Sequence, residues 1–340
     1  MADPDKYKQL PPADDAMKLL WRLTDQLHLT IQDVYRGPSP DHQSFVGSGI
    51  LSDGSVVTLK AAIRPAGNTL DGQMRDFTKE WTLYRLAPTL HDPILKNALP
   101  TILDQGIFED RKWVMYRALA GQTFGGPLYL RDELTEEWRE PISHFLTSLH
   151  TSTSEIAPQI PGLRSRKADF YREHLVQSLQ RHWDDVARFF PGKTTAWLFE
   201  LFDDAAHSLD QAQLVLAHGD LHPGNFFHED NYSFTVIDWE KVYTGNPLAD
   251  ATYLWVRFWR APWRDQVIHQ VLRDYPATNA WRPIPALRYL VASQLVSELH
   301  SWQKEANWSA FPLKDQIEHV LDIYAHDLAD VAARRGLFGE

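Results

Sequence analysis

The sequence predicts an α+β fold in two parts, a small β-rich N-terminal lobe and a larger, mainly helical C-terminal lobe. Strand-like segments separated by turn residues dominate before residue 120, and helical periodicity dominates after it. The length of 340 residues suits about two domains. We therefore expect an N-terminal helical segment over residues 1–29, an N-lobe over 30–120 and a C-lobe over 121–340.

The clearest strand signals form a hairpin in the N-lobe. Residues 44–52 and 55–63 are rich in strand-forming side chains. They are joined by Asp53-Gly54, a dipeptide that readily adopts the positive φ of a tight turn. We expect two strands of matched length here, with Lys60 on the second.

A helix and two further strands are expected after the hairpin. Residues 76–86 carry Phe77, Trp81 and Tyr84 on one face of a helical repeat. The strand signals that follow lie at residues 105–108 and 112–117.

The second half of the chain is expected to be mainly helical. Apolar residues recur at helical spacing in residues 142–149, 169–190, 287–302 and 314–333, whereas the strong strand signals lie at residues 214–217 and 233–237. A seam between a β-rich lobe and a helical lobe is a usual place for a ligand cleft.

The composition excludes several classes of function. The chain has no cysteine, which excludes disulfides, thiolate nucleophiles, iron–sulfur clusters and cysteine-ligated zinc. Its net charge of −11 argues against a general affinity for nucleic acid or anionic membranes. No basic segment and apolar stretch mark a signal peptide, and no apolar run is long enough to span a membrane, so we expect a cytoplasmic protein.

Two polar motifs follow the two strand signals of the second half. Residues 218–225 (HGDLHPGN) follow the first strand, and residues 237–240 (IDWE) follow the second. Asp and Asn commonly cap turns after strands, which is the simplest structural explanation for either motif alone. Together, however, the pattern H-x-D-L-x-x-x-N and a later aspartate are typical of the catalytic loop and metal-binding residue of kinases.

In these motifs the chain resembles the aminoglycoside phosphotransferase and choline kinase group of small-molecule kinases, which have a bilobal protein-kinase-like fold. The resemblance covers most of residues 30–260 in order. Residues 245–250 (GNPLAD) resemble a further element of that group. Only eleven residues separate Asp238 from Asp250, too few for the activation segment of a protein kinase. The resemblance implies transfer of the ATP γ-phosphate to a hydroxyl of a small molecule, with Mg²⁺.

The resemblance assigns a role to each motif residue. Asp220 would orient the acceptor hydroxyl and accept its proton. Asn225 and Asp238 would supply oxygen ligands to magnesium, which takes waters and substrate phosphates for the rest. His218 and Asp250 would brace the loop.

The N-lobe offers candidates for ATP binding. Lys60 matches the strand lysine that binds the α- and β-phosphates, and Glu80 is the expected partner that holds this lysine in place. Asp76 lies one turn earlier and competes with Glu80 for that role. Residues 113–118 resemble the strand and hinge of the family, where backbone groups of Tyr116 and Ala118 would contact the adenine.

The phosphate-covering loop has two candidate positions. Residues 47–49 (GSG) would leave only residues 50–52 as a strand before the turn. Residues 37–44 (GPSPDHQS) leave two hairpin strands of matched length, so we expect the loop there, with Ser44 and backbone amides contacting phosphate. The departure from G-x-G-x-x-G leaves the individual contacts open.

The acceptor site is expected to come mainly from the helices beyond Asp250. Aromatic faces beside carboxylates can hold a cationic amine or stack on a sugar, and the negative net charge favours the approach of a polycation. Tryptophans at helical spacing are also common in hydrophobic cores. The candidate substrate residues are Glu240, Trp255, Trp259, Glu298 and Trp302.

The leading prediction is an ATP- and magnesium-dependent kinase of an aminoglycoside-type antibiotic or a related cationic or sugar-like acceptor, with no nucleic-acid or membrane partner. The alternative is a metabolic kinase for choline, ethanolamine, homoserine or a sugar, although His-Gly-Asp at residues 218–220 argues mildly against choline. A catalytically silent nucleotide-binding module is the third possibility. The shared motifs belong to phosphoryl transfer and do not identify the acceptor.

Overall fold

A computed structural model of the chain describes residues 14–36, 44–63, 77–126, 134–228, 232–276, 280–304 and 314–333. The chain divides into two units. Unit 1 consists of Met1–Gly121, Pro158–Gly162 and Thr235–Val242, and unit 2 consists of Gln122–Ala157, Leu163–Phe234 and Tyr243–Glu340.

Unit 1 is built around a five-stranded antiparallel sheet with the strand order β1-β2-β3-β5-β4. The edge strand β1 carries two register irregularities against β2, and the pairing of β3 with both β2 and β5 places β3 at the centre. The elements in chain order are α1 (Asp14–Gln26), β1 (Leu29–Arg36), β2 (Ser44–Leu51), β3 (Val56–Ala62), α2 (Phe77–Leu86), α3 (Pro93–Ala98), β4 (Ile102–Phe108) and β5 (Arg111–Arg117).

The predicted hairpin is confirmed as β2 and β3, with Gly54 at a φ of 85° in the connecting turn. Gly47 and Gly49 lie inside β2, not in a loop. A Cβ at either glycine would come within 2.8 Å of a backbone oxygen of β1, so these two positions need glycine for close packing of the strands. Asp76 and the predicted loop residues 37–43 lie outside the described residues.

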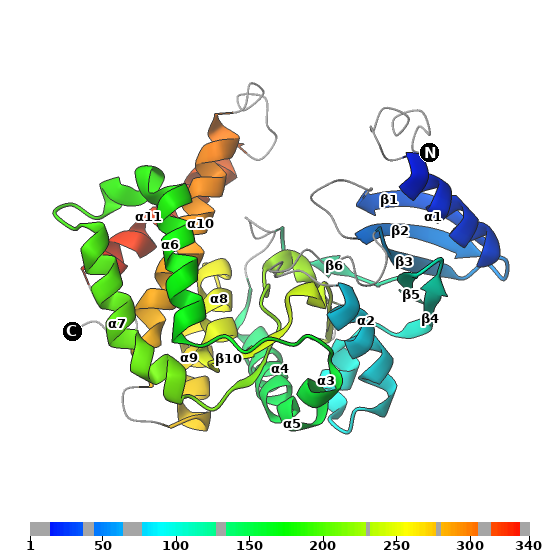
Figure 1. Ribbon diagram of the computed structural model, residues 1–340, viewed down its shortest axis with the longest axis horizontal. Coiled ribbons are helices and arrows are strands. Elements are labelled where there is room, and N and C mark those ends of the chain that lie inside the picture. The colour runs from blue at the N-terminus through cyan, green and yellow to red at the C-terminus, as the bar shows by residue number, and fades with distance from the viewer. Residues whose placement is uncertain are drawn as a thin grey trace. The chain divides into compact units, whose positions relative to one another are not determined.

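The two faces of β3 serve different purposes. Val57 and Leu59 pack against Leu20 and Leu23 of α1, which lies along this face of the sheet (Figure 1). Successive side chains of a strand point to opposite faces, so Lys60 lies on the other face. That face is also buried, because Lys60 is only 3% exposed.

Unit 2 is mainly helical, and α10 packs against α6, α7, α8 and α11. Figure 1 shows α6 and α10 side by side. Among the described residues, no helix combines the length and the apolar character that crossing a membrane requires. The helices are α4 (Arg139–Thr151), α5 (Thr153–Ile156), α6 (Ala168–Val186), α7 (Thr195–Gln211), α8 (Leu248–Arg257), α9 (Arg264–Asp274), α10 (Pro283–Gln303) and α11 (Lys314–Ala332).

Short strands position the polar motif of unit 2. The antiparallel pairing of β7 with β10 places Ala217, the last residue of β7, opposite Tyr243. Residues 218–225 therefore begin beside the segment that leads into α8. The short strands are β6 (Gln122–Thr123), β7 (Val215–Ala217), β8 (Phe226–His228) and β10 (Tyr243–Gly245), while β9 (Phe234–Val236) crosses from unit 2 into unit 1.

The tryptophans are divided between the core and the surface. Trp113 in unit 1 and Trp138 and Trp263 in unit 2 are buried. The indole N–H of Trp263 donates to the carbonyl oxygen of Thr135 at 2.8 Å, which satisfies its polar atom inside the core. Trp21 and Trp281, in contrast, are 50% and 41% exposed.

Candidate active site

Unit 1 contains a buried ionic cluster centred on Lys60, which we call the lysine cluster: Lys60, Glu80, Asp238 and Glu240. The Lys60 Nζ atom lies 2.5 Å from Glu80 Oε2, 2.8 Å from Asp238 Oδ1 and 2.9 Å from Glu240 Oε1. Lys60, Glu80 and Glu240 are each at most 3% exposed. A buried lysine is rarely retained without paired charges, and here the carboxylates come from two separate segments.

The segment 235–242 reaches the lysine cluster through a tight turn. Asp238 has a φ of 66° and a ψ of 53°, in the left-handed region that Asp tolerates better than most residues. Trp239 is fully buried, and its indole N–H donates to the carbonyl oxygen of Val236 at 2.9 Å. The Lys79 ammonium donates to the carbonyl oxygen of Val242 at 3.2 Å. These contacts hold the segment within unit 1.

Three carboxyl groups surround the single ammonium group of the lysine cluster. Burial raises the pKa of the Glu80 carboxyl to about 7, and the nearby Lys60 ammonium opposes that rise. Oxygen atoms of Glu80, Asp238 and Glu240 lie within 4.8 Å of one another. Carboxylate oxygens are the hard ligands that magnesium prefers, so the donor chemistry of the cluster fits this ion.

Ser44 is buried at the start of β2, where its hydroxyl donates to Glu240 Oε1 at 2.7 Å. The structure thus shows Ser44 supporting a carboxylate of the lysine cluster. Its predicted contact with a nucleotide phosphate and the acceptor contact predicted for Glu240 stay predictions.

A Ser44→Ala variant is expected to lower the free energy of unfolding by about 1–3 kcal/mol, because Glu240 loses a buried hydrogen-bond donor. Urea denaturation measures this loss, with exposed Ser52→Ala as the matched control. Equal stability of the two variants would contradict a supporting role for the Ser44 hydroxyl.

The residues predicted to meet the adenine lie in β5 and just after it. Tyr116 is buried, and its ring contacts Tyr84 edge-on with 6.3 Å between centroids. The backbone N–H of Ala118 donates to the carbonyl oxygen of Val56 at 3.2 Å, so this donor is already engaged in the sheet. The adenine contacts of Tyr116 and Ala118 stay predictions.

In unit 2 the motif of residues 218–225 forms a loop held by its own hydrogen bonds. The Asp220 backbone N–H donates to the His218 Nδ1 atom at 3.1 Å, and the Asn225 side-chain amide donates to the Asp220 carbonyl oxygen at 2.8 Å. Both contacts are buried. His218 therefore braces the loop, and Asn225 also supports the backbone at Asp220.

Asp250 fastens this loop to α8. Its two carboxylate oxygens accept hydrogen bonds from the backbone N–H groups of His218, at 2.6 Å, and Gly219, at 3.0 Å. Gly219 has a φ of 81°, a conformation that glycine adopts without steric cost. Burial raises the pKa of Asp250 to about 6, although the two N–H donors lower it.

Because the folded-state pKa of Asp250 is raised from 3.8 to about 6, its protonated form favours the folded state. This contribution is complete below about pH 4 and is lost as the pH rises through about 6. Relative to Asp250→Asn, the wild-type chain should lose about 2 kcal/mol of unfolding free energy between pH 4 and pH 7.

Urea denaturation of both chains at several pH values checks this comparison. A difference between wild type and Asp250→Asn that stays constant with pH would show that Asp250 does not titrate in this way.

Tyr253 contacts the loop and Arg257 contacts Tyr253, and neither is among the predicted site residues. The Tyr253 hydroxyl donates to Asp220 Oδ1 at 2.7 Å, and Arg257 Nη2 donates to the Tyr253 oxygen at 2.9 Å. Asp250, Tyr253 and Arg257 recur at helical spacing on one face of α8. The helical spacing of Tyr253 and Arg257 from Asp250 was the signal in the sequence that could have identified these two residues.

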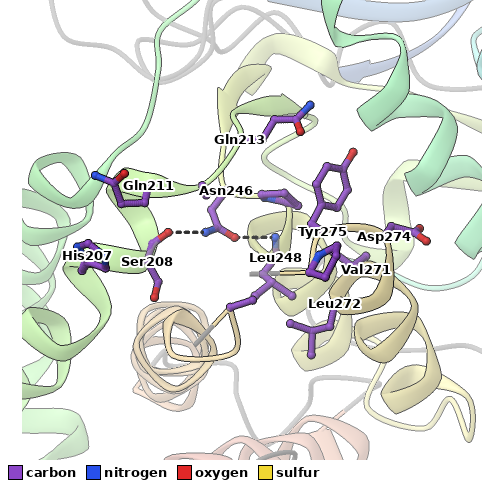
Figure 2. Close-up of a pocket in the computed structure, with 14 residues that line it drawn as sticks. His207, Ser208, Gln211, Gln213, Asn246, Leu248, Val271, Leu272, Asp274 and Tyr275 are labelled. Carbon is purple, nitrogen blue, oxygen red and sulfur yellow. Dashed lines mark hydrogen bonds between the residues drawn. The ribbon is translucent and has the colours of Figure 1, made fainter. Parts of the chain in front are cut away.

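A cavity of about 430 Å³ lies elsewhere in unit 2, beside the start of α8. Figure 2 shows Asn246 between α7 and α8: its amide donates to the Ser208 carbonyl oxygen at 3.5 Å, and its carbonyl accepts from the Leu248 N–H at 2.9 Å. Asn246 therefore fixes the helix start that carries Asp250. None of the predicted site residues lines this cavity.

The predicted acceptor residues have varied surroundings. Trp255 is buried, its N–H donates to Asp265 at 2.6 Å, and the guanidinium groups of Arg264 and Arg288 cover its ring. Trp259 is half-buried, with its ring edge-on to His319. Glu298 is half-buried and accepts from the Gln294 amide at 2.7 Å. The Trp302 side chain lies outside the described residues, and all four substrate contacts stay predictions.

Comparisons with known proteins identify the family and the fold of the chain. The model of a family described as the phosphotransferase enzyme family matches residues 91–287. No curated protein sequence gives a significant match to this chain.

Solved structures share the fold at low sequence identity. A macrolide 2′-phosphotransferase from Brachybacterium faecium is 20% identical with a TM-score of 0.53, over 90% of this chain and 97% of that one. An aminoglycoside 2′-phosphotransferase solved with GDP is 15% identical with a TM-score of 0.57, over 94% and 99% of the two chains. A spectinomycin phosphotransferase solved with ADP and spectinomycin is 15% identical with a TM-score of 0.56, over 93% and 97%. The expected α+β, kinase-like fold class is confirmed.

Proposed function

Because the chain belongs to the phosphotransferase enzyme family, we propose that it transfers the γ-phosphate of ATP, with Mg²⁺, to a hydroxyl group of a small molecule. The observation that carries this proposal is the lysine cluster, in which a buried ammonium is held by buried carboxylates on two segments. Buried ionisable groups in such clusters are common where a protein handles a charged substrate.

Lys60 is the proposed contact for the nucleotide phosphates. Its ammonium is fixed by Glu80 and Glu240, so little side-chain entropy remains to be lost when an anion binds. Nucleotide binding is supported by the relatives solved with GDP and with ADP. We keep Asp238 and Asn225 as the predicted magnesium ligands. A bound magnesium ion would neutralise charge on the transferring phosphate.

Asp220 is the proposed group that orients the acceptor hydroxyl and accepts its proton. Phosphoryl transfer passes through a loose transition state, so positioning contributes more than a strong base does. The loop bonds from His218 and Asn225 and the α8 contact from Tyr253 restrict both the backbone and the side chain of Asp220. This restraint suits a positioning group.

The proposed acceptor is an aminoglycoside-type antibiotic or a related cationic or sugar-like molecule. The net charge of −11 favours a cationic acceptor. Relatives of the same fold include an aminoglycoside 2′-phosphotransferase solved with GDP and kanamycin and the spectinomycin complex. Kanamycin and spectinomycin are the ligands of those two proteins. The product assay described next identifies the acceptor of this chain.

A product assay tests the proposed function. The purified chain is incubated with ATP or GTP, with and without Mg²⁺, and with kanamycin, spectinomycin, a macrolide, choline, homoserine or a sugar. Mass spectrometry is expected to find a phosphorylated antibiotic only when nucleotide and Mg²⁺ are both present. Phosphorylation of choline, homoserine or a simple sugar alone would replace the antibiotic acceptor with a metabolic one. Absence of both nucleotide binding and phosphorylated product would contradict the proposed function.

A further inference from the structure

A hydrogen-bond chain leads from Arg257 through Tyr253 to Asp220 within unit 2. Arg257 Nη2 lies 2.9 Å from the Tyr253 oxygen, and that oxygen lies 2.7 Å from Asp220 Oδ1. A guanidinium group can only donate hydrogen bonds, so the tyrosine oxygen accepts from Arg257. The single phenol proton is therefore directed to the Asp220 carboxylate. Arg257 therefore fixes the direction of the hydrogen bond from Tyr253 to Asp220.

The surroundings of Arg257, Tyr253 and Asp220 keep their hydrogen bonds intact. Asp220 and Arg257 are 4% and 5% exposed. Burial raises the pKa of the Tyr253 phenol well above its usual value, so the phenol remains a donor. The Arg257 guanidinium also lies over the Tyr253 ring, 4.9 Å from its centroid. The phenol is therefore held both by a hydrogen bond and by the cation above its ring.

One helix thus contacts the loop at two points. Asp250, in the first turn of α8, accepts from the backbone N–H groups of His218 and Gly219. Tyr253, one turn further along the same face, donates to the side chain of Asp220. The helix α8 therefore holds both the backbone of the loop and the side-chain carboxylate of Asp220 in place.

We propose that Tyr253, oriented by Arg257, is a positioning residue that sets the rotation of the Asp220 carboxylate toward the acceptor hydroxyl. This inference rests on the proposed role of Asp220. One carboxylate oxygen is fixed by a charge-assisted hydrogen bond, which is stronger than a neutral one and fixes the carboxylate plane. Tyr253 contacts neither phosphate nor nucleotide in this role, so its removal affects the transfer step and not nucleotide binding.

Tyr253→Phe tests the proposal, because it removes one hydroxyl and preserves the ring. Turnover is measured as phosphate transfer from Mg-ATP to kanamycin and as phosphate release from Mg-ATP with water as acceptor. We expect kcat to fall about 10- to 100-fold, because a misplacement of about 1 Å at a catalytic group can cost 10²-fold, while KM for ATP changes less than about twofold. The control is Tyr289→Phe, a buried tyrosine of α10 that contacts Phe190 and should leave kcat unchanged.

Coupling distinguishes positioning from a general structural effect. Tyr253→Phe should have no further effect on the residual turnover of Asp220→Asn, because both changes act on the same carboxylate. Arg257→Met should lower kcat in the wild-type background and have a smaller effect beside Tyr253→Phe. Full additivity of either pair would overturn the proposal.

A spectroscopic measurement separates failure of this inference from failure of the proposed function. The infrared carboxylate band assigned to Asp220, from the difference between wild type and Asp220→Asn, should shift in Tyr253→Phe but not in Tyr289→Phe. An unshifted band, or an unchanged kcat with Asp220→Asn inactive, overturns the positioning role alone. An Asp220→Asn variant as active as wild type overturns the proposed function itself.

Discussion

An Asp220→Asn variant is expected to transfer phosphate about 10²- to 10⁴-fold more slowly than the wild-type chain, the usual cost of losing a positioned proton acceptor. Asparagine has the same shape and can still accept the Tyr253 hydrogen bond through its carbonyl oxygen. The fold and the loop are therefore expected to persist, and only the negative charge and the proton affinity are lost.

The measurement is the turnover of Mg-ATP with the acceptor that the product assay identifies, together with the affinity for ADP by calorimetry. ADP affinity should stay within about threefold, a difference below 1 kcal/mol, because Asp220 is not among the proposed phosphate contacts. Asp184→Asn, an exposed change of the same chemistry on α6, should behave as wild type. Turnover of Asp220→Asn at the wild-type rate would remove Asp220 from the mechanism.

A Lys60→Met variant is expected to lose about 3–5 kcal/mol of unfolding free energy, because it leaves the carboxylates of the lysine cluster buried without their cation. Methionine has a similar length, so packing on Phe77, whose ring centroid is 5.6 Å from the ammonium, is largely kept. Affinity for ATP should fall as well, because the proposed phosphate contact is removed.

A double-mutant comparison identifies the cause of this loss. Adding Glu80→Gln should restore part of the stability of Lys60→Met, because it removes one of the carboxylates left unpaired. Glu80→Gln alone should cost less than Lys60→Met, because Lys60 keeps its contacts with Asp238 and Glu240. Lys193→Met, at an exposed position, is the control for removing a lysine. If Glu80→Gln further weakened Lys60→Met, unpaired charge would not be the source of instability.

The secondary structure of unit 1 could be predicted because its signals are local. Asp53-Gly54 marks the turn of the β2–β3 hairpin, and the apolar spacing of Phe77, Trp81 and Tyr84 marks α2. The edge strand β1 was not predicted, because its polar residues and two irregular positions weaken the alternation of apolar and polar side chains. Local signals therefore located the elements better where the backbone is regular.

The contacts of the site were only partly predictable. Spacing and motif placed Lys60 and Glu80 on neighbouring elements, but nothing local indicates that Ser44 donates to Glu240, 196 residues away. Tyr253 was missed because a tyrosine in a helix is usually a packing residue. It becomes recognisable only when its position is compared with Asp250, one turn earlier on α8. Long-range side-chain contacts depend on tertiary packing, which the sequence pattern does not encode directly.

The large sequence separation between the residues of the lysine cluster also constrains the order in which parts of the chain can fold during synthesis. Lys60 and Asp238 are 178 residues apart in the sequence. At a usual translation rate of about 5–20 residues per second, the ribosome adds the last acidic segment about 10–35 s after Lys60. Until then we expect the Lys60 ammonium to stay hydrated, because Glu80 alone would supply one of its three carboxylate contacts and burial of a charge is costly. The N-terminal sheet can form earlier, but the lysine cluster closes only after most of the chain has been translated.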